Sequence, residues 1–304
     1  MQLQSVSQLT HDFARPGLRF EKGPGGLIVA VVETSSCKAR VSLLGGQLLD
    51  YAPAHSENLI WLSRTAKFGE GKAIRGGVPV CWPWFGPHPD DPKLPQHGFV
   101  RNRFWRVEAS GSDDQGEPWL TLALEDDHET LTLWPHRFRL ELEIRFGRRL
   151  GMELRTHNRD REPFTITEAL HTYFEVGDIN SVQVGGLSGF SYKDKVLGFA
   201  EGVQTGPVKL SAETDRVFEG HDGICEIDDP SLRRAVRIRR FGSRSVVVWN
   251  PWQEKAAGMA DFDDDGWRNM LCVEAANALA DVVTVEPDGE HSLVMQVETL
   301  PLPE

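Results

Sequence analysis

Residues 138–146 read Phe-Arg-Leu-Glu-Leu-Glu-Ile-Arg-Phe and alternate apolar with charged side chains without a break. A period of two puts every apolar side chain on one face, which is typical of a strand with one buried and one solvated face. Residues 120–124 and 293–297 alternate in the same way. Further aliphatic or β-branched runs, separated by turn signals, occupy 27–32, 236–238, 246–248 and 282–285. Only the short segment 253–260 favours a helix, so the sequence predicts an all-β fold in which antiparallel sheets pack face to face as a sandwich.

The size and charge of the chain narrow the kinds of protein it can be. No internal repeat or linker-like stretch interrupts the 304 residues, so we expect one domain spanning 1–304. The formal net charge is −12, from 33 Lys and Arg against 45 Asp and Glu. An acidic surface repels nucleic acid and anionic lipid. We therefore expect a small-molecule partner, no nucleic-acid or membrane partner, and a monomer.

The cysteines and the start of the chain favour the cytoplasm. Cys37, Cys81, Cys225 and Cys272 form no Cys-x-x-Cys pair, which in a chain of this length indicates free thiols in a reducing compartment. Residues 1–16 contain no apolar segment of the kind that directs secretion, and no run of 18 apolar residues occurs. The cytoplasm is the expected location.

One segment breaks the strand pattern. Six prolines lie between Pro79 and Pro95, interleaved with Trp82, Trp84 and Phe85. Proline lacks the donor that a central strand needs, so this segment predicts a loop. Two interpretations stay open: a rigid loop packed on the surface, or the wall of a binding pocket.

Four short segments carry polar groups that could do chemistry, namely 72–77 (Lys-Ala-Ile-Arg-Gly-Gly), 96–103 (Gln-His-Gly-Phe-Val-Arg-Asn-Arg), 169–174 (Ala-Leu-His-Thr-Tyr-Phe) and 271–277 (Leu-Cys-Val-Glu-Ala-Ala-Asn). The glycines of the first let the backbone approach an anion, and the arginines of the first two suit phosphate geometry. His171 stands among apolar and aromatic residues, and Glu274 ends a short apolar strand, where a carboxyl group can become a base. Each segment also has a purely structural interpretation, as a surface arginine, a satisfied core histidine or a paired carboxylate.

The sequence contains no complete motif for binding a metal or a cofactor. Residues 261–266 (Asp-Phe-Asp-Asp-Asp-Gly) resemble the first half of an EF-hand loop, but the position that should hold the final Glu ligand is Cys272. The histidines show no metal-ligand spacing, and the phosphate-binding loop, the dinucleotide fingerprint and the serine-hydrolase elbow are missing. We therefore expect neither metal nor cofactor.

Taken together, the polar segments resemble the glucose-6-phosphate 1-epimerase family, the hexose-phosphate branch of the aldose 1-epimerases. The matching blocks, which follow one another in the family's order, are 73–87, 96–101, 169–179, 214–218, 249–252 and 270–274. The resemblance implies a galactose-mutarotase-like β-sandwich and an isomerase that interconverts the α and β anomers of glucose 6-phosphate or a similar hexose 6-phosphate.

The resemblance also implies roles for individual residues. It makes His171 the general acid and Glu274 the general base. It places Arg75, Gln96, Arg101 and Asp215 at the substrate, with His97 as a further donor to the sugar.

Anomerisation fits these residue types, because ring opening needs one proton delivered to the ring oxygen and one removed from the anomeric hydroxyl. No redox change occurs, so no cofactor is required, and the remote phosphate can anchor the sugar. Two alternatives stay open. One is an epimerase for free aldoses, which would not need Arg75 and Arg101 near an anion. The other is a non-catalytic carbohydrate-binding sandwich with Trp82, Trp84 and Trp252 as stacking platforms.

Overall fold

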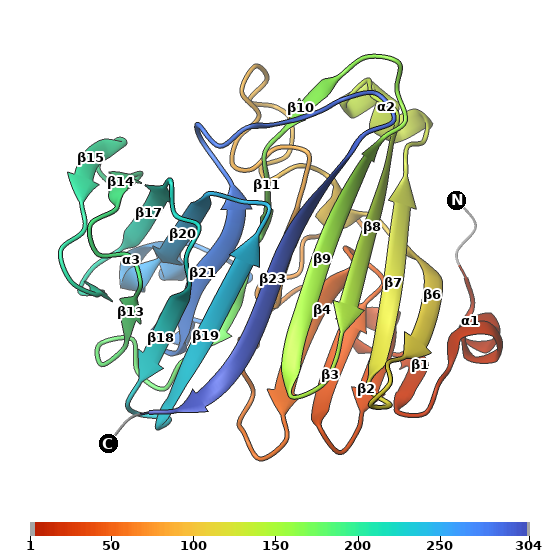
Figure 1. Cartoon of the computed structure of the whole chain (residues 1–304), viewed down its shortest axis with the longest axis horizontal. Helices are drawn as coiled ribbons and strands as arrows, with labels where there is room; N and C mark the ends of the chain where they lie inside the picture. Colours follow the sequence, from red (N-terminus) through yellow and green to blue (C-terminus); the bar gives the residue numbers. More distant parts are fainter. Residues whose placement is uncertain (1–3, 303–304) are drawn as a thin grey trace.

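The computed structural model describes residues 4–302, and antiparallel sheets make up most of it (Figure 1). The largest sheet has nine strands in the order β16-β13-β18-β19-β23-β9-β8-β7-β6. Its members are β6 (Arg106–Ser112), β7 (Pro118–Glu125), β8 (Phe138–Arg145), β9 (Arg149–Asn158), β13 (Gln183–Gly185), β16 (Val208–Lys209), β18 (Cys225–Asp229), β19 (Arg234–Phe241) and β23 (Glu290–Pro301).

A second sheet of eight strands faces one half of the first. Seven strands follow the order β15-β14-β17-β20-β21-β11-β5, and β12 also pairs with β21. The members are β5 (Val80–Cys81), β11 (Glu168–Leu170), β12 (Tyr173–Glu175), β14 (Ser191–Asp194), β15 (Ala200–Val203), β17 (Thr214–Glu219), β20 (Ser245–Asn250) and β21 (Met270–Asn277).

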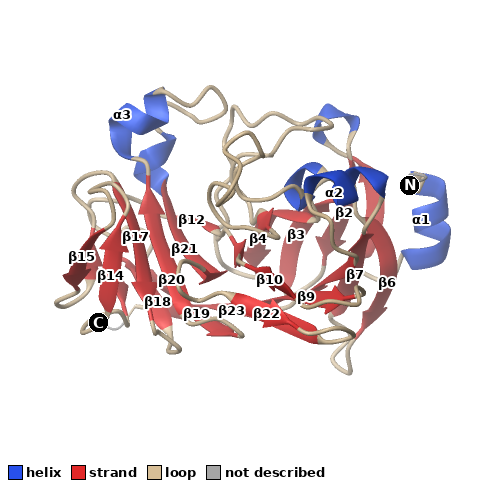
Figure 2. Cartoon of the chain, turned by 90° about the horizontal axis from the view of Figure 1, so that it is seen from above, coloured by secondary structure: helices blue, strands red, loops and turns tan. Residues whose placement is uncertain are grey.

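Two smaller sheets and a few short helices complete the fold. The four-stranded sheet contains β1 (Leu18–Lys22), β2 (Ile28–Glu33), β3 (Cys37–Ser42) and β4 (Gln47–Pro53), and the two-stranded sheet contains β10 (Phe164–Ile166) and β22 (Val283–Val285). The helices are α1 (Val6–Phe13), α2 (His128–Leu133) and α3 (Trp252–Ala257), with single 3₁₀ turns at 24–26, 100–102 and 266–269. Figure 2 shows the nine-stranded sheet on one side, the four- and eight-stranded sheets across from it, and α2 and α3 among the loops at one edge. The prediction of an all-β sandwich is confirmed.

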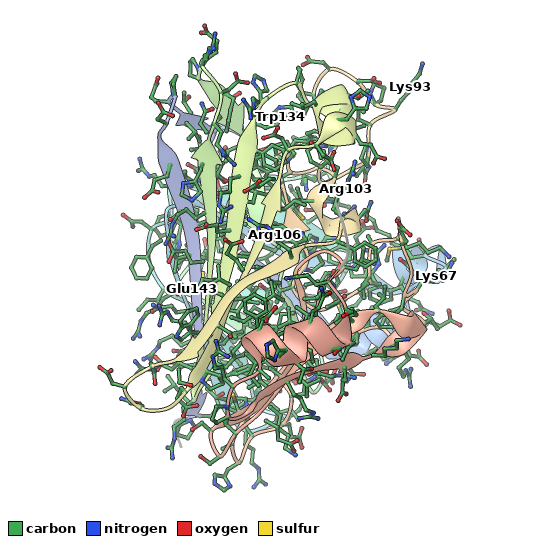
Figure 3. All side chains as sticks on the ribbon, turned by 90° about the vertical axis from the view of Figure 1, so that its right-hand side faces the viewer. Lys67, Lys93, Arg103, Arg106, Trp134 and Glu143 are labelled. Carbon is green, nitrogen blue, oxygen red and sulfur yellow. The ribbon has the colours of Figure 1, made fainter. Side chains whose placement is uncertain are left out.

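Residues 138–145 form β8, in which the apolar side chains are buried on one face, as the period of two predicts. Leu140, Leu142 and Ile144 are fully buried between the sheets, and each contributes about 1.5–3 kcal/mol relative to exposure. The alternating charged residues lie on the outer face, where Arg139 pairs with Glu141 at 2.8 Å. Figure 3 shows the molecule from the side of this sheet, with Arg106 and Glu143 among the labelled residues. Such partly exposed ion pairs add little to the free energy of unfolding, so the contribution of this strand to stability comes mainly from its buried face.

The three short helices were not all predicted from the sequence. Helix α3 confirms the predicted helix at 253–260, whereas α1, of eight residues, and α2, of six, were not predicted. Both begin at a capping box, at Ser5 with Gln8 and at Asp127 with Thr130. These short motifs signal a helix start even where the apolar pattern is too brief to do so.

Each of the two interpretations of the proline-rich segment, a packed loop and a pocket wall, describes part of it. Its first part forms β5, which pairs with β11 at the end of the eight-stranded sheet, so no central strand is interrupted. Trp82 is fully buried and donates its Nε1 hydrogen to Thr156 Oγ1 at 3.0 Å. Phe85 and Pro87, further along, line the cavity described below. The segment is therefore a packed loop that also forms one wall of a cavity.

The four cysteines are buried and none forms a disulfide, as the sequence predicted. Within residues 4–302, no helix has the length and apolar character needed to cross a bilayer. The single-domain organisation stays a prediction.

Candidate active site

A polar cavity of about 380 Å³ opens at the surface of the eight-stranded sheet, a volume within the range of small-molecule sites. Its walls come from that sheet, from the proline-rich loop and from the chain beside α3. The lining residues are Arg75, Phe85, Gly86, Pro87, Gln96, His97, His171, Tyr173, Lys195, Asp215, Val247, Trp249, Lys255, Met259 and Glu274. Six of the seven predicted site residues are in this set, drawn from segments up to about two hundred residues apart.

A larger groove of about 510 Å³ lies elsewhere, beside Arg148, Arg233 and Arg234. We place the candidate site in the smaller cavity because it gathers buried and half-buried groups whose pKa values are shifted, which is a property of functional sites.

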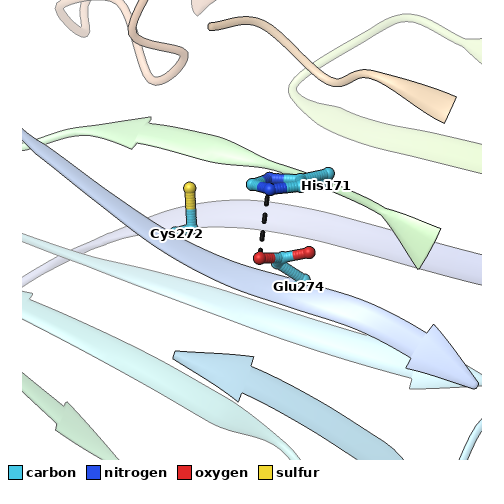
Figure 4. A group of neighbouring side chains, drawn as sticks. All are labelled: His171, Cys272 and Glu274. Atoms are coloured by element: carbon cyan, nitrogen blue, oxygen red, sulfur yellow. Dashed lines mark ion pairs between the residues drawn. The ribbon is translucent and has the colours of Figure 1, made fainter. Parts of the chain in front are cut away.

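Strand pairing brings His171 and Glu274 together. Leu170 lies opposite Ala275 and Tyr173 lies opposite Cys272, so His171, between them, falls beside Glu274. The distance from His171 Nδ1 to Glu274 Oε1 is 3.5 Å (Figure 4). His171 is 8 % exposed and Glu274 1 %. The aromatic ring of Tyr173 stacks on His171 with centroids 4.9 Å apart, which fixes the plane of the imidazole.

The surroundings push this pair toward its neutral forms. Burial raises the pKa of the Glu274 carboxyl well above its usual range, with Asp215 adding to the rise and Lys195 opposing it. Burial lowers the pKa of His171 well below its usual range, and so do His97 and the neighbouring cations. Moving a proton from His171 to Glu274 therefore costs less here than it would in water.

His97 lies at the end of the proline-rich loop, with its ring centroid 5.6 Å from that of His171. Its Nδ1 accepts a hydrogen bond from the Gly86 backbone at 3.3 Å. Burial, together with the nearby cations, lowers the pKa of His97 to about 3. The side chain is therefore a neutral imidazole at neutral pH and can donate only through Nε2.

Arg75 is held in the cavity wall by two partners. Its Nη1 donates to the Tyr173 hydroxyl at 3.2 Å, and its Nε lies 3.3 Å from Asp261 Oδ1. Burial opposes the charge of Arg75, but Tyr173 and Asp261 outweigh that effect and raise its pKa. The acidic turn that resembled half of a calcium loop thus supplies a carboxylate to an arginine. Gly77, two residues after Arg75, has φ +70°, and a Cβ there would lie 2.3 Å from the Leu48 carbonyl oxygen, so the glycine is sterically required.

Two lysines complete the basic side of the cavity. Lys195 Nζ lies 3.1 Å from Asp215 Oδ1, and Lys255 Nζ lies 2.6 Å from Glu213 Oε1. Burial raises the pKa of Asp215, and Lys195 opposes this rise. Sequence reasoning selected Asp215 and missed both lysines, because an isolated lysine in a polar stretch gives no signal.

Gln96 and Arg101 lie differently relative to the cavity. Gln96 lines the cavity and is exposed. Arg101 does not line it: its Nη2 donates to the Gln96 carbonyl at 2.7 Å. Arg101 thus supports the loop that carries Gln96 and His97, rather than standing beside Arg75 in the wall.

The aromatic residues in the wall are not the ones first expected. Trp82 and Trp84 are 0 % and 5 % exposed, so they pack in the interior and cannot serve as sugar-stacking platforms. Trp252 packs on Trp267, with centroids 4.6 Å apart. Trp249 lines the cavity instead, edge-on to His171. Tyr173 and Trp249 each belong to a block quoted above for the resemblance, which is the signal that could have found them.

The antiparallel β-sandwich, with a polar cavity that holds a buried histidine beside a buried glutamate, has the architecture of the mutarotase-like proteins. The aldose 1-epimerase family model matches residues 29–298. A Salmonella typhimurium protein provisionally named glucose-6-phosphate 1-epimerase is 39 % identical over 279 residues, covering 91 % of this chain and 90 % of its own. An Escherichia coli K12 protein with the same provisional name is 40 % identical over 253 residues, covering 83 % and 84 %.

The crystal structure of YeaD from Salmonella typhimurium, provisionally described as a mutarotase, superposes with a TM-score of 0.88 at 34 % identity and 96 % coverage of both chains. The chain belongs to the aldose 1-epimerase family, and it is an isomerase that acts on a sugar.

Proposed function

We propose that this protein interconverts the α and β anomers of a hexose 6-phosphate, with glucose 6-phosphate as the first substrate to test. The observation that carries the proposal is the His171–Glu274 pair, 3.5 Å apart at the base of a cavity whose wall also holds Arg75, Lys195 and Lys255. The provisional names of the Salmonella and Escherichia coli relatives support the same substrate.

The closeness of the pair suits the reaction, because the ring oxygen and the anomeric hydroxyl oxygen are bonded to the same carbon. In the opening step, protonated His171 gives its proton to the ring oxygen while ionised Glu274 takes the proton of the anomeric hydroxyl. The bond between the ring oxygen and C1 breaks, and C1 becomes an aldehyde carbon. After rotation about the bond between C1 and C2, the reverse transfers close the ring on the other face and return each group to its starting state.

The burial of the pair favours this cycle. Opening converts an ion pair into two neutral groups, and the shifts described above favour the neutral forms of both His171 and Glu274. The open-chain intermediate is therefore matched by the protonation state that the buried site prefers. His97, neutral at physiological pH, is placed to donate a hydrogen bond to a sugar oxygen.

The cations of the cavity wall favour a phosphosugar over a free one. Each of them already has a carboxylate or hydroxyl partner that holds it in place, so no large rearrangement is needed to receive a phosphate. A charge-assisted hydrogen bond to such a group contributes about 1.5–3 kcal/mol. Because the phosphate is remote from C1, this binding energy orients the sugar without entering the chemical step.

The experiment is anomer exchange followed by NMR magnetisation transfer, with glucose 6-phosphate and glucose compared at equal concentration below saturation. One charge-assisted contact corresponds to at least about 10-fold in kcat/KM, so we expect the phosphosugar to be favoured by that factor or more. Equal rates on the two sugars would contradict the phosphate preference while leaving the epimerase activity intact. No acceleration on either sugar would contradict the proposed activity.

A further inference from the structure

Cys272 lies beside the catalytic pair but has no part in the proton transfers proposed above. It precedes Glu274 by two residues on β21, so both side chains project from the same face of the strand. Its own neighbours across the sheet are Tyr173 and Trp249, two residues of the cavity wall. Cys272 is fully buried.

These side chains form a group with the spacing of a metal site. One ligand atom from each of His171, Cys272 and Glu274 lies within 4.8 Å of the other two. Figure 4 shows the sulfur, the imidazole and the carboxylate on one face of β21. His171 Nδ1 and one carboxylate oxygen of Glu274 are buried without a hydrogen-bond partner, so each has a free electron pair once deprotonated.

From this geometry we infer that the protein binds one Zn²⁺ ion, or a metal of similar softness, through His171, Cys272 and Glu274. Zinc bonds of about 2.0–2.3 Å around a tetrahedral centre put ligand atoms about 3.3–3.8 Å apart. The nitrogen-to-oxygen distance of 3.5 Å already falls in this range. The remaining separations need to close by at most about 1 Å, which a side-chain rotation supplies.

The ligand types select the metal. Sulfur and imidazole suit zinc and other late transition metals, whereas Mg²⁺ and Ca²⁺ require oxygen ligands. A thiolate and a carboxylate carry two negative charges, which cancel the charge of Zn²⁺. Binding expels the thiol proton of Cys272 and the carboxyl proton of Glu274, so a neutral group of side chains becomes a neutral metal complex. Lys195 and Arg75 oppose a cation here, but each is paired with its own aspartate.

The inferred metal site has a consequence for activity that rests on the proposed function. Zinc occupies the electron pairs of His171 and Glu274 that the proton transfers require. The fourth position of the metal faces the cavity, because His171 and Glu274 line it. Zinc therefore acts as a reversible inhibitor that competes with the sugar, and a chelator restores the rate.

The metal site is tested by titrating the intact protein with Co²⁺, a spectroscopic substitute for zinc, and recording near-ultraviolet absorbance. A charge-transfer band from thiolate sulfur to cobalt, saturating at one equivalent and abolished by excess Zn²⁺, is expected. Calorimetric titration with Zn²⁺ gives the affinity directly. Neither readout depends on anomerase activity, so failure of the proposed function leaves this test intact. Absence of the cobalt band in the folded wild-type protein would overturn the inference.

The variants Cys272→Ala and Cys272→Ser locate the site, and Cys225→Ala is the matched control because Cys225 is also buried but lies on β18. Loss of a direct ligand is expected to weaken zinc binding by more than about 100-fold, since changes outside the ligand shell already cost 10–100-fold. Zinc inhibition of anomer exchange should weaken in parallel. Unchanged zinc affinity in a folded Cys272 variant, or equal loss in Cys225→Ala, would overturn the assignment.

Discussion

Replacing Lys195 with Met should weaken binding of a hexose 6-phosphate while leaving the chemical step nearly unchanged. Lys195 follows β14, lines the cavity, and reaches Asp215 with its ammonium nitrogen at 3.1 Å. Methionine keeps most of the side-chain length and removes the charge together with the N–H donors. Since the phosphate is remote from C1, its contact with Lys195 is equally strong in the ground and transition states, and its loss appears in KM.

The size of the effect follows from the contact that is lost. A charge-assisted hydrogen bond contributes about 1.5–3 kcal/mol, which corresponds to a rise in KM of about 10- to 100-fold. The Lys195 side chain is 23 % exposed, so screening by solvent reduces this effect only in part. Removing Lys195 also leaves Asp215 as an uncompensated carboxyl group, which repels a phosphate when ionised. The penalty should therefore be larger for the phosphosugar than for glucose.

The assay is the rate of anomer exchange as a function of glucose 6-phosphate concentration, with melting temperature as a check on folding. Lys193→Met is the matched control: Lys193 lies two residues earlier, pairs with Glu219 at 3.7 Å, and does not line the cavity. Its KM should equal that of the wild type. A folded Lys195→Met protein with unchanged KM, or with reduced kcat at unchanged KM, would refute the role of Lys195 as a phosphate ligand.

The remaining predictions concern the loop, the proton pair and metals. Gly98→Ala should lower the free energy of unfolding by about 1–3 kcal/mol or more, because at φ +71° a Cβ there would lie 1.8 Å from the Trp82 carbonyl oxygen. Urea unfolding measures this change. The control is Gly116→Ala, whose Cβ would meet no atom within 4 Å and whose free energy of unfolding should fall less. The pH profile of kcat should be bell-shaped with limbs spread apart, since the pair must hold one proton: the lowered pKa of His171 moves the acid limb down, and the raised pKa of Glu274 moves the basic limb up. A narrow bell would contradict these shifts. EDTA should leave the rate of the purified protein undiminished; a loss restored by one particular metal would contradict a cofactor-free mechanism.

The sequence was most informative where a local pattern has one physical reading. The alternation in 138–146 could be read as a half-buried strand because its period of two fits no helix. The position of β23 between β19 and β9 could not be read, because it depends on pairing between residues about 50 to 150 positions apart. Sheet order follows from long-range pairing, which one sequence does not display.

Some residues of the candidate site could likewise be predicted from the sequence, and others could not. His171 and Glu274 stood out as polar groups in apolar strands, but only the resemblance to the epimerase family separated a catalytic role from a purely structural one. Arg101 was expected at the substrate but lies outside the cavity lining, because the direction of a long side chain depends on the loop it meets, here the Gln96 carbonyl. Lys195 was missed because its importance comes only from the fold, which turns the end of β14 toward Asp215.

The most direct test of the account measures anomer exchange of glucose 6-phosphate by NMR magnetisation transfer in Glu274→Gln and His171→Asn. Both variants keep a polar side chain of similar size, and His136→Asn and Glu226→Gln, which lie outside the cavity, are the controls. Each catalytic variant should lose about 10²–10⁴-fold in kcat with phosphosugar affinity nearly unchanged, and the double variant should be little worse because the pair acts as a unit. A folded variant at either position that binds the phosphosugar and exchanges its anomers at the wild-type rate would contradict the account.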